Sequence, residues 1–328
     1  MIDNYCLDNY RLCSHHFSRL LTLLLCTLAI HVHVQADQYG NTETQISPDP
    51  LLLLVGMDEA NRRHSFSGLL TYEANGYMST MRLNQTASND TVNQRLNFLD
   101  GPKRQIVRKN LLSDCDRGTS QSWPRKIEVD RLVKVYDITF DGVERIADRE
   151  AYAIAVKPRD DHRYGYRFSV DGETGLLLKT LLIANNTVVE RLQFIELLLL
   201  NGDGQNLLKE SDANYDNQVI TRLASGSCQS NAINSQWHAD WLPEGFLPVD
   251  SHVTDHGEQV LVFSDGLATL SVFIADQYES VNKATARYGA TVAVILPLKG
   301  VDKESMAIVV GEIPMSTARQ VAVSLRSR

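Results

Sequence analysis

The chain has 328 residues, of which 43% are hydrophobic and 22% charged, a balance typical of globular proteins. This composition excludes collagen-like, coiled-coil, polytopic membrane and disulfide-dense proteins, and the length suits one large domain or two ordinary ones. The chain carries 32 Lys and Arg against 40 Asp and Glu, a formal net charge of −8. An acidic surface repels phosphate, so nucleic acid is not expected as a partner.

Residues 1–36 predict a secretory signal peptide. An apolar core, Leu20–Ile30, is followed by Val34-Gln35-Ala36, which puts small residues at a cleavage site. A membrane anchor is the less favoured alternative, because spanning a bilayer takes ~20 apolar residues. Cleavage would leave 328 − 36 = 292 residues and only two of the five cysteines, Cys115 and Cys228. Whether these two pair in an oxidising compartment stays open.

Residues 37–200 predict a half-open antiparallel barrel packed on a helix. The helix is expected from Pro48 to about Arg63, because Pro suits a first turn and apolar residues recur on one face. Strands are expected at Phe66–Tyr72, Tyr77–Leu83, Arg95–Leu99, Lys103–Arg108, Leu132–Phe140, Ala151–Pro158, Tyr164–Val170, Leu176–Ile183 and Val188–Leu198, with turns at Asn75-Gly76, Asp100-Gly101, Asp141-Gly142 and Asp171-Gly172. Short connections favour antiparallel neighbours, and so large a sheet must curl around the helix.

The composition changes at residue 201. Residues 201–235 are rich in Gly, Asn, Asp, Ser and Gln and predict a linker, with a helical turn around Val219–Leu223. Residues 236–328 predict a second, smaller domain. Its expected strands are Val260–Phe263, Leu267–Ile274, Thr291–Pro297 and Ala307–Ile313, and its expected helices are Asp276–Ala286 and Thr317–Leu325.

The sequence contains no recognisable catalytic or metal-binding motif. Nucleophile elbows, phosphate loops, dinucleotide fingerprints and zinc protease motifs are absent. Asp212–Asp216 matches three positions of a calcium loop, but the required Gly and bidentate Glu are replaced. His252 and His256 have the spacing of a helical metal pair but lie in an expected loop without a third ligand. We therefore expect neither an enzyme nor a bound metal or cofactor.

Two features remain as candidate binding sites. A basic stretch is either a solvated sheet face or a docking site for acidic lipid headgroups or an acidic peptide; its residues are Arg95, Lys103, Arg104 and Arg108. The segment Trp237–Phe246 carries three aromatic residues around a Pro–Gly turn at the start of the second domain. Such aromatics form either a small-domain core or an interface.

Several segments follow one another in an order that resembles a known family. They are Arg95–Arg104, Arg145–Arg149, Tyr164–Lys179, Trp241–Phe246, Phe263–Leu267 and Val309–Pro314. Together they are similar to the RseB/MucB family of periplasmic sigma-E factor regulatory proteins, over nearly the whole exported chain. The resemblance implies an α+β fold, with a LolA/LolB-like half-open antiparallel β-barrel packed on helix and a smaller α/β domain.

The resemblance also implies a function in the periplasm. The protein would bind the periplasmic segment of an RseA/MucA-like membrane-anchored anti-sigma factor and shield it from site-1 proteolysis, and lipid or lipopolysaccharide would release it. We expect the second domain to contact the partner through Trp241, Leu242, Phe246, Gly311, Ile313 and Pro314. The alternative is a periplasmic lipid or lipoprotein carrier of the LolA/LolB type. The lipid and any homo-oligomer stay open.

Overall fold

The computed structural model describes residues 47–88, 91–109, 127–200, 219–223, 235–254, 257–276, 283–298 and 305–327. They belong to one compact unit, Ser47–Arg328. The predicted signal peptide, Cys115, Cys228, the calcium-like loop and His256 lie outside the described residues. Among the described residues, every helix is too short or too polar to span a bilayer.

The first helix, α2, comprises Pro50–Arg63, two residues later than the predicted start. Asp49 explains the difference, because its side chain accepts a hydrogen bond from the Leu51 amide at 2.8 Å and so caps the helix. Proline occupies the first helical position, where its missing N–H costs nothing. Leu54 and Met57 are fully buried on the face that packs against the sheet.

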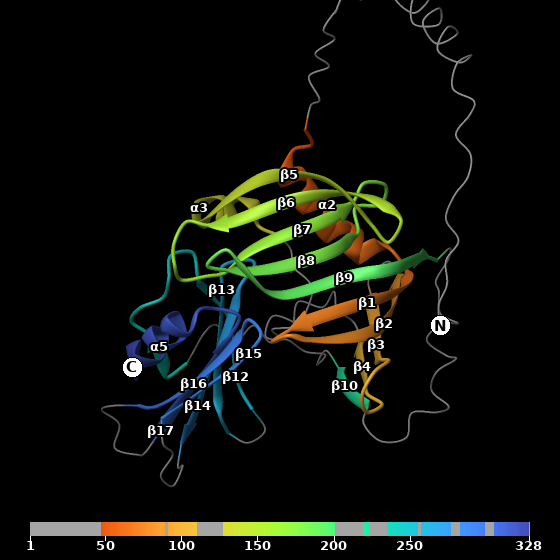
Figure 1. Cartoon of the computed structure of the whole chain (residues 1–328). Coiled ribbons are helices and arrows are strands. Elements are labelled where there is room, and N and C mark those ends of the chain that lie inside the picture. The colour runs from red at the N-terminus through yellow and green to blue at the C-terminus, as the bar shows by residue number, and fades with distance from the viewer. Residues whose placement is uncertain are drawn as a thin grey trace, which may run out of the picture. The chain divides into compact units, whose positions relative to one another are not determined.

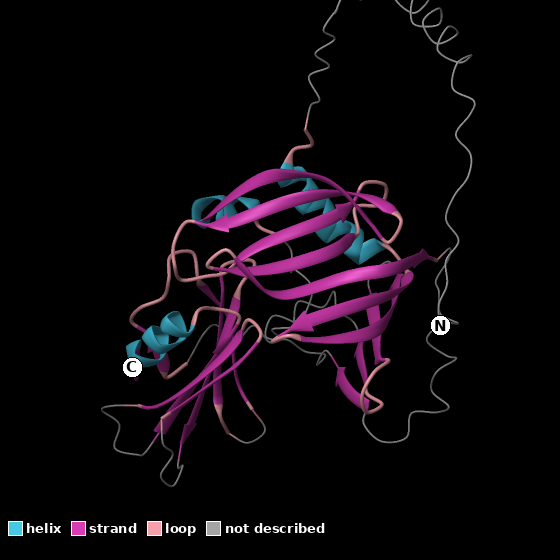
Figure 2. Ribbon diagram, viewed as in Figure 1, coloured by secondary structure: helices cyan, strands magenta, loops and turns pink. Residues whose placement is uncertain are grey.

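A ten-stranded sheet follows (Figures 1 and 2). Its strands are β1 Phe66–Ala74, β2 Tyr77–Ser88, β3 Thr91–Phe98, β4 Gln105–Lys109, β5 Tyr136–Ile146, β6 Arg149–Pro158, β7 Gly165–Asp171, β8 Leu177–Ala184, β9 Thr187–Leu199 and β10 Val219–Leu223. The order is β10-β4-β3-β2-β1-β9-β8-β7-β6-β5, and only the β10–β4 pair is parallel. Because β10 and β5 are the two edges, the sheet is open. The predicted α+β class with a half-open antiparallel sheet is confirmed.

One face of this sheet carries the core that α2 covers. Side chains alternate along each strand, so every second residue points to the face on which the helix lies. Leu54 and Met57 pack with Val156, Phe168 and Leu177, while Ala60 belongs to a second cluster with Leu70, Leu83 and Phe194. The end of α2 is fixed by Gln85, whose amide donates to the carbonyl oxygens of Asn61 at 2.7 Å and His64 at 2.9 Å.

Two local predictions for this region are wrong. Asp141-Gly142 is not a turn but a bulge inside β5, where the register shifts between Phe140 and Val143 and Gly142 has φ 102°. The chain reverses later, at Ala147 and Asp148, which both have positive φ. In addition, residues 129–135 form a helix, α3 (Val129–Val135), where a strand from Leu132 was expected. Leu132 and Val135 are three residues apart and bury the same helical face.

The second sheet is antiparallel and has the order β12-β13-β14-β17-β16-β15. Its strands are β12 Leu247–Val253, β13 Gln259–Ser264, β14 Thr269–Asp276, β15 Ala284–Tyr288, β16 Thr291–Pro297 and β17 Ser305–Gly311. Helix α5, Met315–Ser324, packs on β16 and β17 and confirms the predicted closing helix. A short pair, β11 Trp237–Ala239 with β18 Leu325–Ser327, completes this part.

Two helical predictions fail here. Asp276 ends β14 and residues 284–286 belong to β15, which pairs with β16, so the predicted helix Asp276–Ala286 is wrong at both of its ends, and residues 277–282 lie outside the described residues. Val219–Leu223 is strand β10 rather than a helical turn, and its run of Val, Ile and Thr suits a strand. The proposed domain bounds, 37–200 and 236–328 with a linker at 201–235, stay a prediction.

Candidate functional site

The two sheets meet at a buried ion pair. Arg163, in the loop before β7, places its Nη1 2.6 Å from Oδ2 of Asp265, and both side chains have no exposed surface. Tyr136 donates its hydroxyl to the same carboxylate oxygen at 2.9 Å. Nη2 of Arg163 also donates to the carbonyl oxygen of Glu244 at 2.6 Å. A charge pair this deep is stable only when its remaining donors and acceptors are satisfied.

Both carboxylate oxygens of Asp265 accept two hydrogen bonds. Oδ1 accepts the backbone amides of Leu267 at 2.9 Å and Ala268 at 2.8 Å, while Oδ2 accepts Arg163 and Tyr136. One carboxylate therefore shapes the turn between β13 and β14 and also receives two donors from the first sheet. Burial, followed by the charge of Asp265, holds the pKa of the Tyr136 hydroxyl well above its ordinary value. Tyr136 consequently acts as a hydrogen-bond donor.

Helix α3 adds further hydrogen bonds between the two sheets beside this ion pair. Arg131 donates Nη2 to the carbonyl oxygens of Ser264 at 2.8 Å and Gly245 at 3.3 Å. Gly266 has φ 109°, and a Cβ there would lie 3.2 Å from Cδ2 of Leu132. Glycine is therefore required at this turn both by its conformation and by the close approach of α3.

A tyrosine also links the two sheets. Tyr164 is buried, and its hydroxyl donates to the carbonyl oxygen of Ile313 at 3.0 Å. The phenol oxygen in turn accepts a hydrogen bond from Nη2 of Arg287, in β15, at 2.9 Å. This phenol therefore receives one hydrogen bond and donates another, and both partners belong to the second domain.

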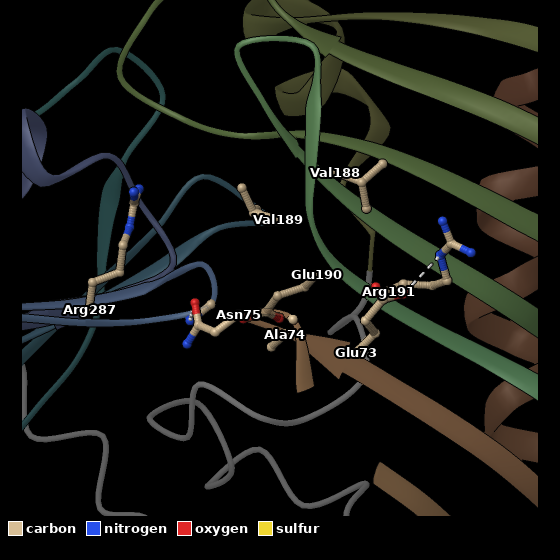
Figure 3. A pocket seen from close by; sticks show the side chains of 10 residues that line it. Glu73, Ala74, Asn75, Val188, Val189, Glu190, Arg191 and Arg287 are labelled. Carbon is tan, nitrogen blue, oxygen red and sulfur yellow. Dashed lines mark hydrogen bonds and ion pairs between the residues drawn. The ribbon is translucent and has the colours of Figure 1, made fainter. Parts of the chain in front are cut away.

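Three hairpin tips meet around a pocket of about 390 Å³ (Figure 3). It is lined by residues 73–76 of the β1–β2 hairpin, by residues 188–191 at the start of β9, and by Arg287 and Gly289. The Gly289 amide donates to Oδ1 of Asn75 at 3.2 Å, and the Ala290 amide donates to Oε1 of Glu190 at 2.6 Å. Arg191 lies beside Glu73 at 3.7 Å, on the opposite side of the pocket from Arg287 (Figure 3). The two guanidinium groups thus do not converge on one anion position.

Two carboxylates, those of Glu190 and Glu312, carry raised pKa values. Burial raises the pKa of Glu190, although the Ala290 amide and the Tyr72 hydroxyl partly offset it by hydrogen bonding. Burial, and then the charge of Glu190, raises the pKa of Glu312 to about 7. Burial and Glu190 also raise the pKa of Tyr72, which therefore stays a donor.

The sequence-predicted partner residues divide into buried and accessible ones. Phe246 and Ile313 are buried in the core of the second domain. Gly311 packs closely against the Thr269 backbone, since a Cβ added to Gly311 would be 2.8 Å from the Thr269 carbonyl oxygen. Trp241, Leu242 and Pro314 are partly exposed, and Trp241 meets the His162 ring edge-on at 5.1 Å between centroids. That these six residues contact a partner stays a prediction.

The predicted basic stretch is split by the sheet. Arg95 pairs with Val107 and Arg108 with Gln94 on adjacent strands, so Arg95 and Arg108 are on opposite faces. Arg95 is buried, whereas Lys103 and Arg104 are exposed at the β3–β4 turn. Arg104 stacks on the Phe98 ring at 3.5 Å. A headgroup site, which stays a prediction, would therefore centre on Lys103 and Arg104.

The described part of the chain contains no candidate metal site. No group of three or more His, Cys, Asp or Glu residues gathers there. His252 instead contacts Asp250, with Nδ1 2.9 Å from Oδ2.

Sequence reasoning missed the residues that join the sheets. Arg163 and Asp265 are 102 positions apart, and Glu190 and Ala290 are 100 apart. Asp265-Gly266 carried a turn signal, but a single sequence does not indicate which distant cation a turn carboxylate meets. The position of Arg163, next to aromatic Tyr164 at the start of a strand, was the one available hint.

Comparison with known proteins gives consistent matches along the chain. The family model described as the MucB/RseB N-terminal domain matches residues 49–219, and the MucB/RseB C-terminal domain matches residues 231–326. The Sigma factor AlgU regulatory protein MucB of Pseudomonas aeruginosa is 36% identical over 284 residues, covering 82% of this chain and 88% of that protein. A solved Pseudomonas aeruginosa MucA/MucB complex contains a similar chain, with TM-score 0.66, 32% identity, and coverage of 86% and 99%. A structure of MucB in complex with MucA(peri) gives TM-score 0.66, 31% identity, and coverage of 85% and 99%.

Proposed function

The chain belongs to the MucB/RseB family, and from that premise we propose that it is a periplasmic negative regulator of the sigma-E envelope stress response. It binds the periplasmic segment of an RseA/MucA-like anti-sigma factor. The observation that carries this proposal is the similarity, over 85% of this chain, to a MucB chain solved with MucA(peri). Both family domains are matched, which favours the whole activity over that of one half.

Binding would shield the anti-sigma segment from the protease that makes the first cut. Lipid or lipopolysaccharide would reverse the shielding by binding the free protein more tightly than the complex. This difference is necessary, because a ligand with equal affinity for both states shifts nothing. Two sheets joined by a few defined contacts can supply two such states, since a ligand on one sheet changes how the other is held.

The partner surface would centre on the second domain. Trp241, Leu242 and Pro314 offer partly exposed apolar groups beside the junction of the sheets. Phe246, Gly311 and Ile313 would support that surface from beneath. Aromatic side chains in such positions often carry a large share of binding energy.

A pull-down with the exported chain tests the proposal. The bait is the periplasmic segment of a MucA-like anti-sigma factor, with and without lipopolysaccharide. Retention without lipopolysaccharide and loss with it are expected. Trp241→Ala should reduce retention, whereas Val323→Ala, which truncates an exposed residue of α5, should not. No retention in either condition would refute the proposal.

The headgroup site has its own test. In Lys103→Glu/Arg104→Glu, more lipopolysaccharide should be needed for release, because two cations at the β3–β4 turn are reversed. Lys157→Glu/Arg159→Glu reverses two exposed cations at and just beyond the end of β6 and serves as the matched control. Equal release curves for both double variants would exclude Lys103 and Arg104 as the headgroup site.

A carrier of lipid or lipoproteins is the second candidate. It is favoured by the open ten-stranded sheet with one apolar face under α2. A carrier would bind lipid without affinity for the anti-sigma segment, so the same pull-down separates the two functions.

A further inference from the structure

Strand β15 forms one edge of the second sheet, and its five residues are all exposed. In the described order of that sheet, β15 stands at one end and pairs only with β16. A free edge leaves a row of unpaired backbone N–H and C=O groups, to which an additional strand can bind. Proteins that do not use such an edge protect it with proline, a bulge or charged side chains.

Two other edge strands of the protein carry this kind of protection. In β12 the register shifts at Pro248. In β5 the register shifts at the bulge that contains Gly142. Strand β15 contains no proline, and it pairs with β16 without a shift over its whole length. Of these three edges, β15 is therefore the one that is open to a further strand.

The pairing with β16 shows which backbone groups of β15 are free. A two-residue turn joins Tyr288 to its partner Thr291. In such a hairpin the pair next to the turn is hydrogen-bonded, and hydrogen-bonded and non-hydrogen-bonded pairs then alternate. Thr285 and Arg287 fall in the non-hydrogen-bonded pairs, so they direct their backbone N–H and C=O groups away from β16 and towards the free edge.

The side chains of this edge are small apart from two cations and one aromatic ring. Alternation places Lys283, just before the strand, and Arg287 on the same face of the edge. The opposite face carries two alanines and the ring of Tyr288, which is 60% exposed. Nη2 of Arg287 donates to the neutral hydroxyl of Tyr164 at 2.9 Å, and this contact leaves the positive charge of Arg287 in place.

We propose that β15 is a docking edge for an extended peptide segment in which acidic and apolar residues alternate. Backbone hydrogen bonds to Thr285 and Arg287 hold the segment as an additional strand. Its acidic side chains lie beside Lys283 and Arg287, and its apolar side chains pack on the face of Tyr288. A second copy of β15 is a poorer occupant, because it would bring one cationic edge against another.

The pocket at the hairpin tips lies at one end of this edge. Arg287 belongs both to β15 and to the lining of the pocket, whose volume is about 390 Å³ (Figure 3). The first sheet touches the hairpin at its turn, where the Gly289 amide donates to Asn75, and leaves the five residues of β15 exposed. A strand added along β15 therefore reaches the pocket with one of its ends and finds room there for a further side chain.

This docking edge goes beyond the proposed function, whose partner surface centres on Trp241, Leu242 and Pro314. The two surfaces belong to different elements of the second domain. The docking edge is tested with a defined peptide and without an anti-sigma segment, so either idea can fail without the other.

An NMR titration of the exported chain tests the docking edge. The probe is a short acetylated peptide in which valine and glutamate alternate. We expect saturable shifts of the Thr285 and Arg287 amides, together with increased protection of both amides from hydrogen exchange. Binding should weaken at high salt. A peptide that alternates valine and lysine, and a peptide with the valines and glutamates in two separate blocks, should leave these amides unchanged.

Two variants separate the backbone from the charge. Thr285→Pro removes an outward N–H without removing a bond to β16, and binding should weaken roughly tenfold. Lys283→Glu should weaken binding roughly threefold or more, whereas Lys157→Glu, an exposed change on β6, should not alter it.

The proposal is refuted if the alternating glutamate peptide leaves the Thr285 and Arg287 amides unchanged, or if the block peptide binds equally well. Unchanged affinity in Thr285→Pro, or in Lys283→Glu, would also overturn it. Protection of the two amides that rises with protein concentration in the absence of peptide would show that a second copy occupies the edge, which contradicts the proposal.

Discussion

Replacing Asp265 by asparagine removes the charge of the buried ion pair while the side chain keeps its size, so the loss of stability measures what the ion pair contributes. The substitution keeps the volume of the side chain but turns one oxygen into an NH₂ group. Both oxygens of Asp265 face donors only: two backbone amides on one side, and Arg163 with Tyr136 on the other. Either orientation of the substituted amide therefore places its N–H groups against N–H or O–H donors.

The expected cost follows from the groups left behind. Two hydrogen bonds are lost, and in one orientation of the amide they include the bond to a guanidinium with no exposed surface. Arg163 keeps Asp160, whose Oδ2 lies 2.8 Å away, and the Glu244 carbonyl oxygen, so its charge is not wholly abandoned. Breaking a buried pair costs about 3–5 kcal/mol, and the remaining partners place this case near the lower end, at about 3 kcal/mol.

Urea unfolding followed by tryptophan fluorescence measures this loss, because Trp237 and Trp241 lie in and against the core of the second domain. Asp240→Asn is the matched control, since that aspartate is half-exposed and its partners are surface residues; a change below about 0.5 kcal/mol is expected. If Asp265→Asn unfolds within about 1 kcal/mol of the unmodified chain, the ion pair does not hold the sheets together as argued.

Three further predictions concern the first sheet. Burial disfavours the charge of Glu144, but hydrogen bonds from Ser169, Lys179 and Arg167 outweigh burial and lower the pKa of Glu144 to about 2. The ionised carboxylate therefore stabilises the fold above pH 4.5, and this contribution is lost as the pH falls towards 2. In Glu144→Gln the unfolding free energy should consequently fall less steeply with decreasing pH in that range. Gly68→Ala should cost about 1–3 kcal/mol in urea unfolding, because its Cβ would lie 2.6 Å from Cδ1 of Phe194, and Phe194→Leu should relieve part of that cost in the double variant. Gln85→Leu should cost about 1–3 kcal/mol and loosen the end of α2 in hydrogen exchange, since two carbonyl oxygens lose their donor; no change in either measurement would mean that this anchor is dispensable.

The elements that depend on local signals could be predicted from the sequence. The Asn75-Gly76 hairpin is confirmed, because both residues adopt the positive φ that a tight turn demands. Helix α2 was predicted from its apolar face, and only the capping residue shifted its start. Membership of the MucB/RseB family was predicted from ordered segments and is confirmed by the family models.

The remaining features depend on distant partners. Asp141-Gly142 satisfies a turn and a bulge equally well, and only the pairing of β5 with β6 decides between them. The same holds for the candidate site. From the sequence, an arginine such as Arg163 is expected at the surface. It is buried only because Asp265, Glu244 and Tyr136 surround it in the fold. The raised pKa values of Glu190 and Glu312 likewise follow from burial in the folded chain, which the sequence does not reveal.

Protection of the anti-sigma segment from cleavage tests the central proposal most directly. The periplasmic segment of a MucA-like factor is incubated with its site-1 protease, alone, with the exported chain, and with the chain plus lipopolysaccharide. The proposed function predicts that the chain slows cleavage at stoichiometric concentration and that lipopolysaccharide restores the original rate. Cleavage at the same rate with and without the chain would contradict it.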